Sequence, residues 1–423
     1  MIVTQLEKAS SYAKPVMQGY QIAVAAGAVS LFYSNIIVYL SLAGLSPVPP
    51  LVVVAGFGVL ALPITVIPGR LWPTVWSPLA AWATVVIATA LWGFLLSSQS
   101  PVATKALADV MGGVGFVMLM VFLLADPGAF RAARATMAAC VLIGIGLNLY
   151  DLTHPLAFSP IIGRASGLYL NPNISALALV FGTVVSIGAL PPRWRLPFLV
   201  TAGLGVSATL SRAGVILWFV ILCLFIANRG ASLRGILTWV LVACGGLGVW
   251  LAVGGGSSLA SLSTDALGGL PLERLSIISA IGDASATTRR EVANAAFALF
   301  ASHPLLGAGL AATSEWALSE GPHNIYLRLA AEHGLVGLLL FPTVALVAAL
   351  PSPPRERSTA VMFIAAWLFA GVFSHNLLQE RPELVALCVL AASSQLWRRS
   401  QSVMESTPTA HCGISAEEGR SNG

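Results

Sequence analysis

A set of polar residues stands close to the points where three apolar segments of this sequence begin. They are Arg164, Asn171, Asn173, Ser211, Arg212, His323 and Asn324. Asparagine and serine at a helix start can cap it, and arginines bind anions through paired hydrogen bonds. A histidine, with a reference pKa of about 6.5, suits general base catalysis near neutral pH. The residue types therefore predict an anion site beside a group that accepts a proton.

Three further arginines belong to the same predicted site. The arginines and histidines of this sequence also have purely structural interpretations. Arg289 and Arg290 precede an amphipathic stretch, and Arg328 follows His323 by five positions. Arg328 and Glu332 have the spacing of an ion pair on one helix, which is as good an interpretation as catalysis. Arginines near a membrane edge are often anchors only. His154, His303 and His333, taken alone, predict packing or capping.

Several kinds of chemistry lack their usual sequence motifs. The chain has no GxxxxGK, GxGxxG, HExxH or GxSxG motif, and its five cysteines form no metal-binding pattern. We therefore expect no metal and no cofactor. The net charge of +5 comes from basic residues scattered between apolar segments, which does not favour nucleic acid as a partner.

The elements that must position these residues are membrane-spanning helices. Hydrophobic residues make up 57% of the chain and charged residues 9%, against about 25% charged in soluble domains. We expect an all-α polytopic membrane protein embedded in a lipid bilayer, with its first apolar run kept as a span and not removed as a signal peptide. About twelve candidate spans begin near residues 21, 51, 77, 105, 134, 174, 196, 214, 235, 334, 358 and 384.

The distribution of basic residues predicts the orientation of these spans. With the N-terminus in the cytoplasm, 14 of the 22 basic residues fall on the cytoplasmic side and the other 8 on the opposite side. The predicted regions are a cytoplasmic N-terminus (1–20), spans one to nine (21–253), a periplasmic loop with catalytic motifs (254–333), spans ten to twelve (334–400) and a disordered cytoplasmic tail (401–423). The even-numbered spans then start at the periplasmic face, where helix N-termini favour anions.

The long predicted loop contains its own helical pattern. Between residues 287 and 310, apolar residues recur at helical spacing at Val292, Ala296, Phe297 and Phe300. This spacing predicts an amphipathic helix on the outer leaflet.

Four stretches, SGLYLNPNISALAL, ATLSRAG, TTRREVANAAFALFASHPLLGAGL and PHNIYLRLAAEHGLVGLLLF, occur in this order within residues 160–345. As an ordered set they resemble the O-antigen ligase and polymerase superfamily of bacterial membrane glycosyltransferases. The resemblance implies transfer of a glycan from an undecaprenyl diphosphate-linked donor to an acceptor hydroxyl at the periplasmic face of the inner membrane, without metal or nucleotide. It also implies that His323 is the base and that Arg212, with Arg289 or its neighbour Arg290, holds the diphosphate. Ala293 departs from the aromatic residue often found there.

The expected function is that of a ligase that joins a glycan to lipid A-core. Within the superfamily, a polymerase that extends a growing glycan and a transferase that attaches glycans to protein remain alternatives. A small-anion transporter is a rival from another class, although the sequence shows no related halves. A non-catalytic subunit of a polysaccharide export system is a further rival and would tolerate loss of His323.

Overall fold

The computed structural model describes residues 2–65, 74, 77–228, 284–318, 321–350 and 352–406, and all regular structure within them is helical. The helices are α1 (Ile2–Tyr33), α2 (Ile36–Leu42), α3 (Pro50–Thr65), α5 (Pro78–Leu96), α6 (Pro101–Leu124), α7 (Pro127–Thr153), η1 (Gly167–Tyr169), α8 (Pro172–Ser186), η2 (Ile187–Ala189), α9 (Pro192–Ala208), α10 (Arg212–Ala227), α13 (Ala284–Ser302), α14 (Ile325–Ala349), η5 (Pro354–Glu356), α15 (Arg357–Phe373) and α16 (Arg381–Ser406). The all-α prediction is confirmed.

Seven of the described helices are long and apolar enough to cross a membrane, and α3 and α10 are shorter apolar helices. The chain is therefore a multi-pass membrane protein. Each predicted span except the ninth falls on one described helix, while the ninth, near residue 235, lies outside the described residues. The count of about twelve spans remains a prediction.

Proline sets many of the helix starts. α3, α5, α6, α7, α8 and α9 all begin at proline, whose fixed φ suits the first helical turn and whose missing N–H would have no partner there. α1 and α14 begin at Ile2 and Ile325, ahead of the predicted span starts near 21 and 334. α16 continues to Ser406, so residues 401–406 of the tail predicted to be disordered are helical, and 407–423 lie outside the described residues.

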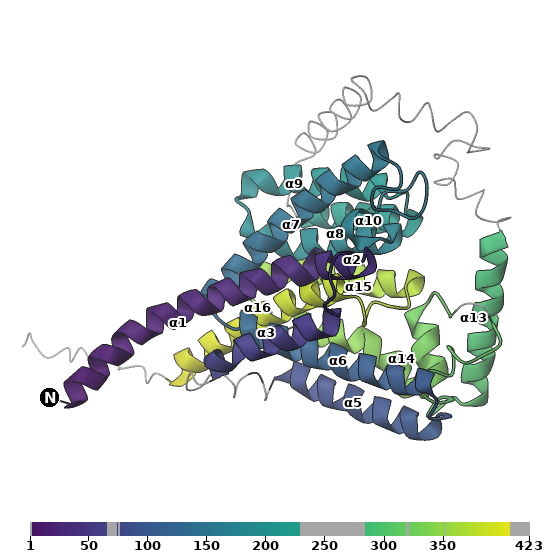
Figure 1. Ribbon diagram of the computed structural model, residues 1–423, viewed down its shortest axis with the longest axis horizontal. Coiled ribbons are helices and arrows are strands. Elements are labelled where there is room, and N and C mark those ends of the chain that lie inside the picture. Colours follow the sequence, from purple (N-terminus) through teal and green to yellow (C-terminus); the bar gives the residue numbers. More distant parts are fainter. Residues whose placement is uncertain are drawn as a thin grey trace, which may run out of the picture.

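Most of the helices run side by side, and α13 does not (Figure 1). It stands upright at the right-hand end of the bundle, across the direction in which α3, α5 and α6 run, and it packs against α14. Val292 and Ala296 are 2% and 0% exposed, as expected for the packed face of an amphipathic helix. Phe297 is 60% exposed and lies off this packed face, and the predicted contact of the helix with the outer leaflet remains a prediction. The predicted loop before α13, from 254 to 283, lies outside the described residues.

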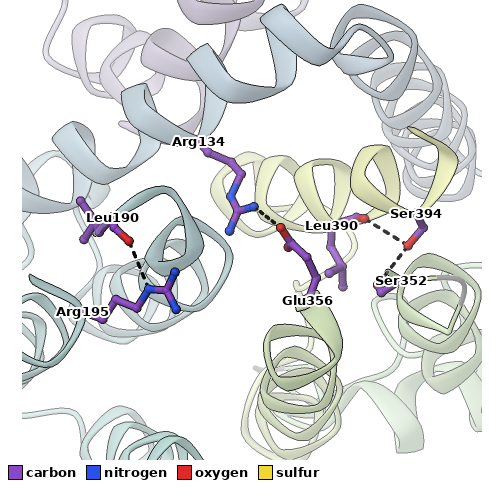
Figure 2. A network of polar contacts seen from close by, with 7 residues as sticks. All are labelled: Arg134, Leu190, Arg195, Ser352, Glu356, Leu390 and Ser394. Atoms are coloured by element: carbon purple, nitrogen blue, oxygen red, sulfur yellow. Dashed lines mark hydrogen bonds and ion pairs between the residues drawn. The ribbon is translucent and has the colours of Figure 1, made fainter. Parts of the chain in front are cut away.

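Polar contacts fasten the helices at the end of the bundle that is predicted to be cytoplasmic (Figure 2). Arg134 of α7 points at Glu356 of η5, with 2.5 Å between Nη1 and Oε1, and both side chains are nearly buried. Ser394 of α16 donates to Ala348 of α14 at 2.6 Å. A buried charge needs such a partner, because its removal from water is costly.

Candidate functional site

α14 is two helical pieces joined at Gly334. Gly334 has φ 63° and ψ −150°, which are not helical angles. The predicted span start near 334 coincides with this break, but the chain is already helical from Ile325. The first piece carries the polar residues Arg328, Glu332 and His333, and the second is the apolar part. A polar helical piece thus leads into an apolar one, with the break at Gly334 between them.

The stretch after α13 supplies the hydrogen bonds that the break removes. Ala308 N–H donates to Ala331 O at 2.8 Å, and Gly309 N–H donates to Glu332 O at 3.1 Å. Leu335 N–H donates back to Pro304 O at 2.9 Å. Buried backbone groups must be paired, so this stretch and the break in α14 depend on each other. The segment PLLGAGL, residues 304–310, belongs to one of the stretches that carry the family resemblance, and it therefore packs against α14.

Gly307 shows how closely the two segments approach. Its φ is +75°, and an added Cβ would collide with the backbone of Glu332. Any other residue would meet both a strained backbone and a clash. The backbone of Gly307 therefore has to lie directly on α14.

Glu332 joins the same two segments through its side chain. It is 1% exposed, and it accepts a hydrogen bond from the hydroxyl of Thr313. Its Oε1 lies 3.5 Å from Arg328 Nε, which confirms the predicted spacing of an ion pair, and the two side chains are only 2% and 15% exposed. The pair lies within one helix and is largely buried. Its place at the break favours a structural role for Glu332.

His323 lies beside a histidine that the sequence analysis did not identify. The rings of His323 and His375 have centroids 5.3 Å apart and planes at 73°. The loop that carries His375 is bound to α14, because Ile325 N–H donates to Ser374 O at 3.1 Å and Arg328 Nη1 donates to His375 O at 3.4 Å. Both histidines are followed by asparagine, and this repeated pair could have pointed to His375.

Asn324 is the N-cap of α14. Its Oδ1 accepts from the N–H groups of Tyr326 at 2.9 Å and Leu327 at 3.2 Å. The predicted caps of the other two helix starts are also confirmed. Asn171 accepts from Asn173 N–H at 2.9 Å, and Ser211 accepts from Gly214 N–H at 3.3 Å. Because these side chains occupy amide donors at all three helix starts, the arginines become the main candidates for binding an anion.

Arg164 is placed next to the start of α10. Its Nε donates to Thr209 O at 3.1 Å, and its Nη2 donates to Asn173 Oδ1 at 2.9 Å. Arg212 is the first residue of α10 and is half-buried. Buried Asp151 holds the loop of Arg164, since its carboxylate accepts from Ser166 N–H at 2.8 Å. One group of predicted residues therefore surrounds the starts of α8 and α10.

A second group consists of His323, Asn324 and Arg328 at the start of α14. The two groups share α15 as a neighbour, because α15 packs against α8, α10 and α14. Arg289 and Arg290 are both exposed on α13. Arg289 stands three residues before buried Val292 and so lies on the packed side of the helix, whereas Arg290 points to the other side.

In the part of the chain that the structure describes, no group of three or more His, Cys, Asp or Glu side chains could hold a metal ion. Residues 197–341 match a family model described as O-antigen ligase. The matched segment runs from α9 to the apolar half of α14 and contains Arg212, Arg289, Arg290, His323 and Arg328. A search of curated proteins gave no match.

Proposed function

We propose, on the premise that residues 197–341 belong to the O-antigen ligase and polymerase superfamily, that this protein is an O-antigen ligase of the bacterial inner membrane. The match to this family supports ligase- or polymerase-type function. The finer proposal is that the donor is a glycan on undecaprenyl diphosphate and the acceptor is a hydroxyl of lipid A-core. Both termini would be cytoplasmic, and the site would face the periplasm.

The observation that carries the proposal is the position of His323 at the start of α14. It packs on His375, it precedes the cap residue Asn324, and it is half-buried. A side chain placed this way can reach a substrate at the membrane surface while its ring is held in position. Positioning of a base in this manner supports general base catalysis.

The proposed reaction needs a base and a clamp for the leaving group. His323 takes the proton from the acceptor hydroxyl, and the oxygen attacks the anomeric carbon of the donor sugar. The bond from that carbon to the diphosphate oxygen breaks, and its electron pair stays on the diphosphate. Arg212 and Arg289 would stabilise this charge through bidentate hydrogen bonds, with Arg164 nearby. The broken glycosyl phosphate bond supplies the driving force, so no nucleotide is needed.

Product analysis with the purified full-length protein tests the proposal. The protein would be incubated with the lipid-linked glycan and lipid A-core, with a chelator present and without nucleotide. We expect glycan joined to lipid A-core. Longer lipid-linked glycans formed in the absence of lipid A-core would identify a polymerase instead, and a strict metal requirement would overturn the mechanism.

A further inference from the structure

A pocket between α5, α6 and α14 lies directly beside the second group of site residues. Its apolar wall includes Trp82, Val86, Ala90, Val110, Gly113 and Leu340. Its polar end consists of Arg328, Glu332, His333, His375 and Gln379. Such a pocket suits a ligand that has an apolar chain and a polar head. Since His375 lines the pocket and also packs on His323, the polar end lies next to the proposed base.

His333 indicates that the polar end is built to receive a ligand. The side chain is 6% exposed, and its Nδ1 has no hydrogen-bond partner among the described residues. Buried polar atoms are nearly always paired, and this unpaired Nδ1, which lies beside Gly93 of α5, belongs to a ring that lines the pocket, so it favours a partner from outside the chain. A hydroxyl group can supply this partner, because it both donates and accepts hydrogen bonds.

The charges at the polar end favour an uncharged head group. Arg328 and Glu332 form an ion pair at 3.5 Å, so their charges offset each other. His375 and Gln379 add hydrogen-bonding groups to the same lining. A diphosphate would meet the carboxylate of Glu332 here, whereas the starts of α8 and α10 offer it Arg164 and Arg212. The donor and this pocket are therefore poorly matched, and a sugar bearing several hydroxyls is well matched.

We propose that this pocket binds the hydrocarbon chain of an amphiphilic glycolipid acceptor and places its hydroxyl-bearing head between His333 and His375. The inference rests on the proposed function, because it assigns the acceptor side of the same reaction. The nucleophilic hydroxyl then reaches His323 from the α14 side, and the donor diphosphate reaches it from the α10 side.

Two glycines of α6 provide a matched test. Gly113 lines the pocket, and an added Cβ there would make ordinary contact with Leu378 O at 3.4 Å. Gly115 is exposed and has nothing within 4 Å of an added Cβ. Gly113→Leu should fill the pocket, and Gly115→Leu adds the same side chain elsewhere on the helix.

The first measurement compares two acceptors with the same sugar, one free and one carrying an octyl chain. Each buried CH₂ strengthens binding by about fourfold, so wild-type protein should show a KM at least about tenfold lower for the octyl glycoside. Gly113→Leu should remove most of this difference, and Gly115→Leu should keep it. Equal KM values for both acceptors in wild-type protein, or equal effects of the two substitutions, would overturn the inference.

The second measurement needs no turnover. An alkyl glycoside that carries a diazirine would be photo-crosslinked to the full-length protein in phospholipid nanodiscs, and the labelled peptides mapped. We expect label in α5, α6 or α14, kept in Gly115→Leu and lost in Gly113→Leu. Label elsewhere, or label displaced equally well by added phospholipid, would overturn the pocket assignment. Label in the pocket of a protein that transfers no glycan would uphold the pocket and contradict the proposed function.

Discussion

The ring of His375 meets the ring of His323 edge to face, with 5.3 Å between their centroids. Such ring pairs stabilise a packing arrangement by about 0.5–1.5 kcal/mol beyond the area they bury. His375 belongs to the loop between α15 and α16, which is also bound to α14 through Ser374. The contact therefore joins two separate parts of the chain at the proposed base.

Replacing His323 tests the base directly. His323→Ala should lower the transfer rate about 10² to 10⁴-fold, which is the usual effect of losing a positioned base. The substitution lies outside the helix itself, so the folded protein should retain its binding of the lipid-linked donor. The measurement is in vitro transfer at matched protein levels. His323→Gln serves as the control, because it offers hydrogen bonds without basicity, and substantial activity in this variant would contradict the role of His323.

Replacing His375 tests whether ring packing positions His323. His375→Ala should lower kcat by about 2- to 10-fold, corresponding to the loss of an edge-to-face contact, while KM for the donor stays the same. His375→Phe keeps a ring and should recover most of the rate at saturating acceptor, where loss of the His375 hydrogen bond to the acceptor head would raise only the KM for the acceptor. The measurement is the kcat and the donor KM of both variants, from steady-state kinetics. A Phe variant as slow as the Ala variant would mean that the imidazole itself is required.

The two neighbouring arginines of α13 should differ in importance. Arg289 lies on the side of α13 that carries buried Val292, so Arg289→Ala should weaken donor binding by at least about tenfold, in line with loss of a charged hydrogen bond. Arg290→Ala should change it little. The measurement is binding of undecaprenyl diphosphate to purified protein. Arg212→Ala should resemble Arg289→Ala, and Arg212→Lys should recover only part of the affinity. Equal effects of Arg289→Ala and Arg290→Ala would contradict this assignment.

Glu380, in the loop before α16, should make stability depend on pH. Burial raises the pKa of its carboxyl from 4.5 to about 7, while the charge of Arg381 acts in the opposite direction. Between these values the folded protein keeps a proton that the unfolded chain releases, so rising pH favours unfolding. The contribution is complete below about pH 4.5 and is lost as the pH rises through about 7.

Thermal unfolding measured from pH 4.5 to 8 checks this prediction. The unfolding temperature of Glu380→Gln should fall less over this range than that of wild-type protein, because the amide does not titrate. Glu291→Gln removes an exposed carboxyl of α13 and should follow the wild-type curve. Parallel curves for wild type and Glu380→Gln would show that Glu380 ionises as freely in the folded protein as in the unfolded chain.

The sequence by itself determined the features that depend on neighbours along the chain. Apolar length predicted the spans, and proline with a preceding polar cap predicted the start of α8, where Asn171 caps the helix as expected. The pair His323 and Asn324 marked the start of a helix for the same reason, since an asparagine side chain satisfies the amides two and three residues later. These interactions are local, so residue types and spacing are sufficient to indicate them.

Only the tertiary structure decided which distant residues meet. Nothing in the spacing connects His375 with His323, or Glu332 with Thr313, because those contacts depend on how α13, α14 and α15 pack. The break at Gly334 likewise exists because hydrogen bonds from the stretch after α13 replace those of a continuous helix. The same packing decides which side chains are buried. His333, which the sequence predicted to be a packing or capping residue, is buried and lines a pocket.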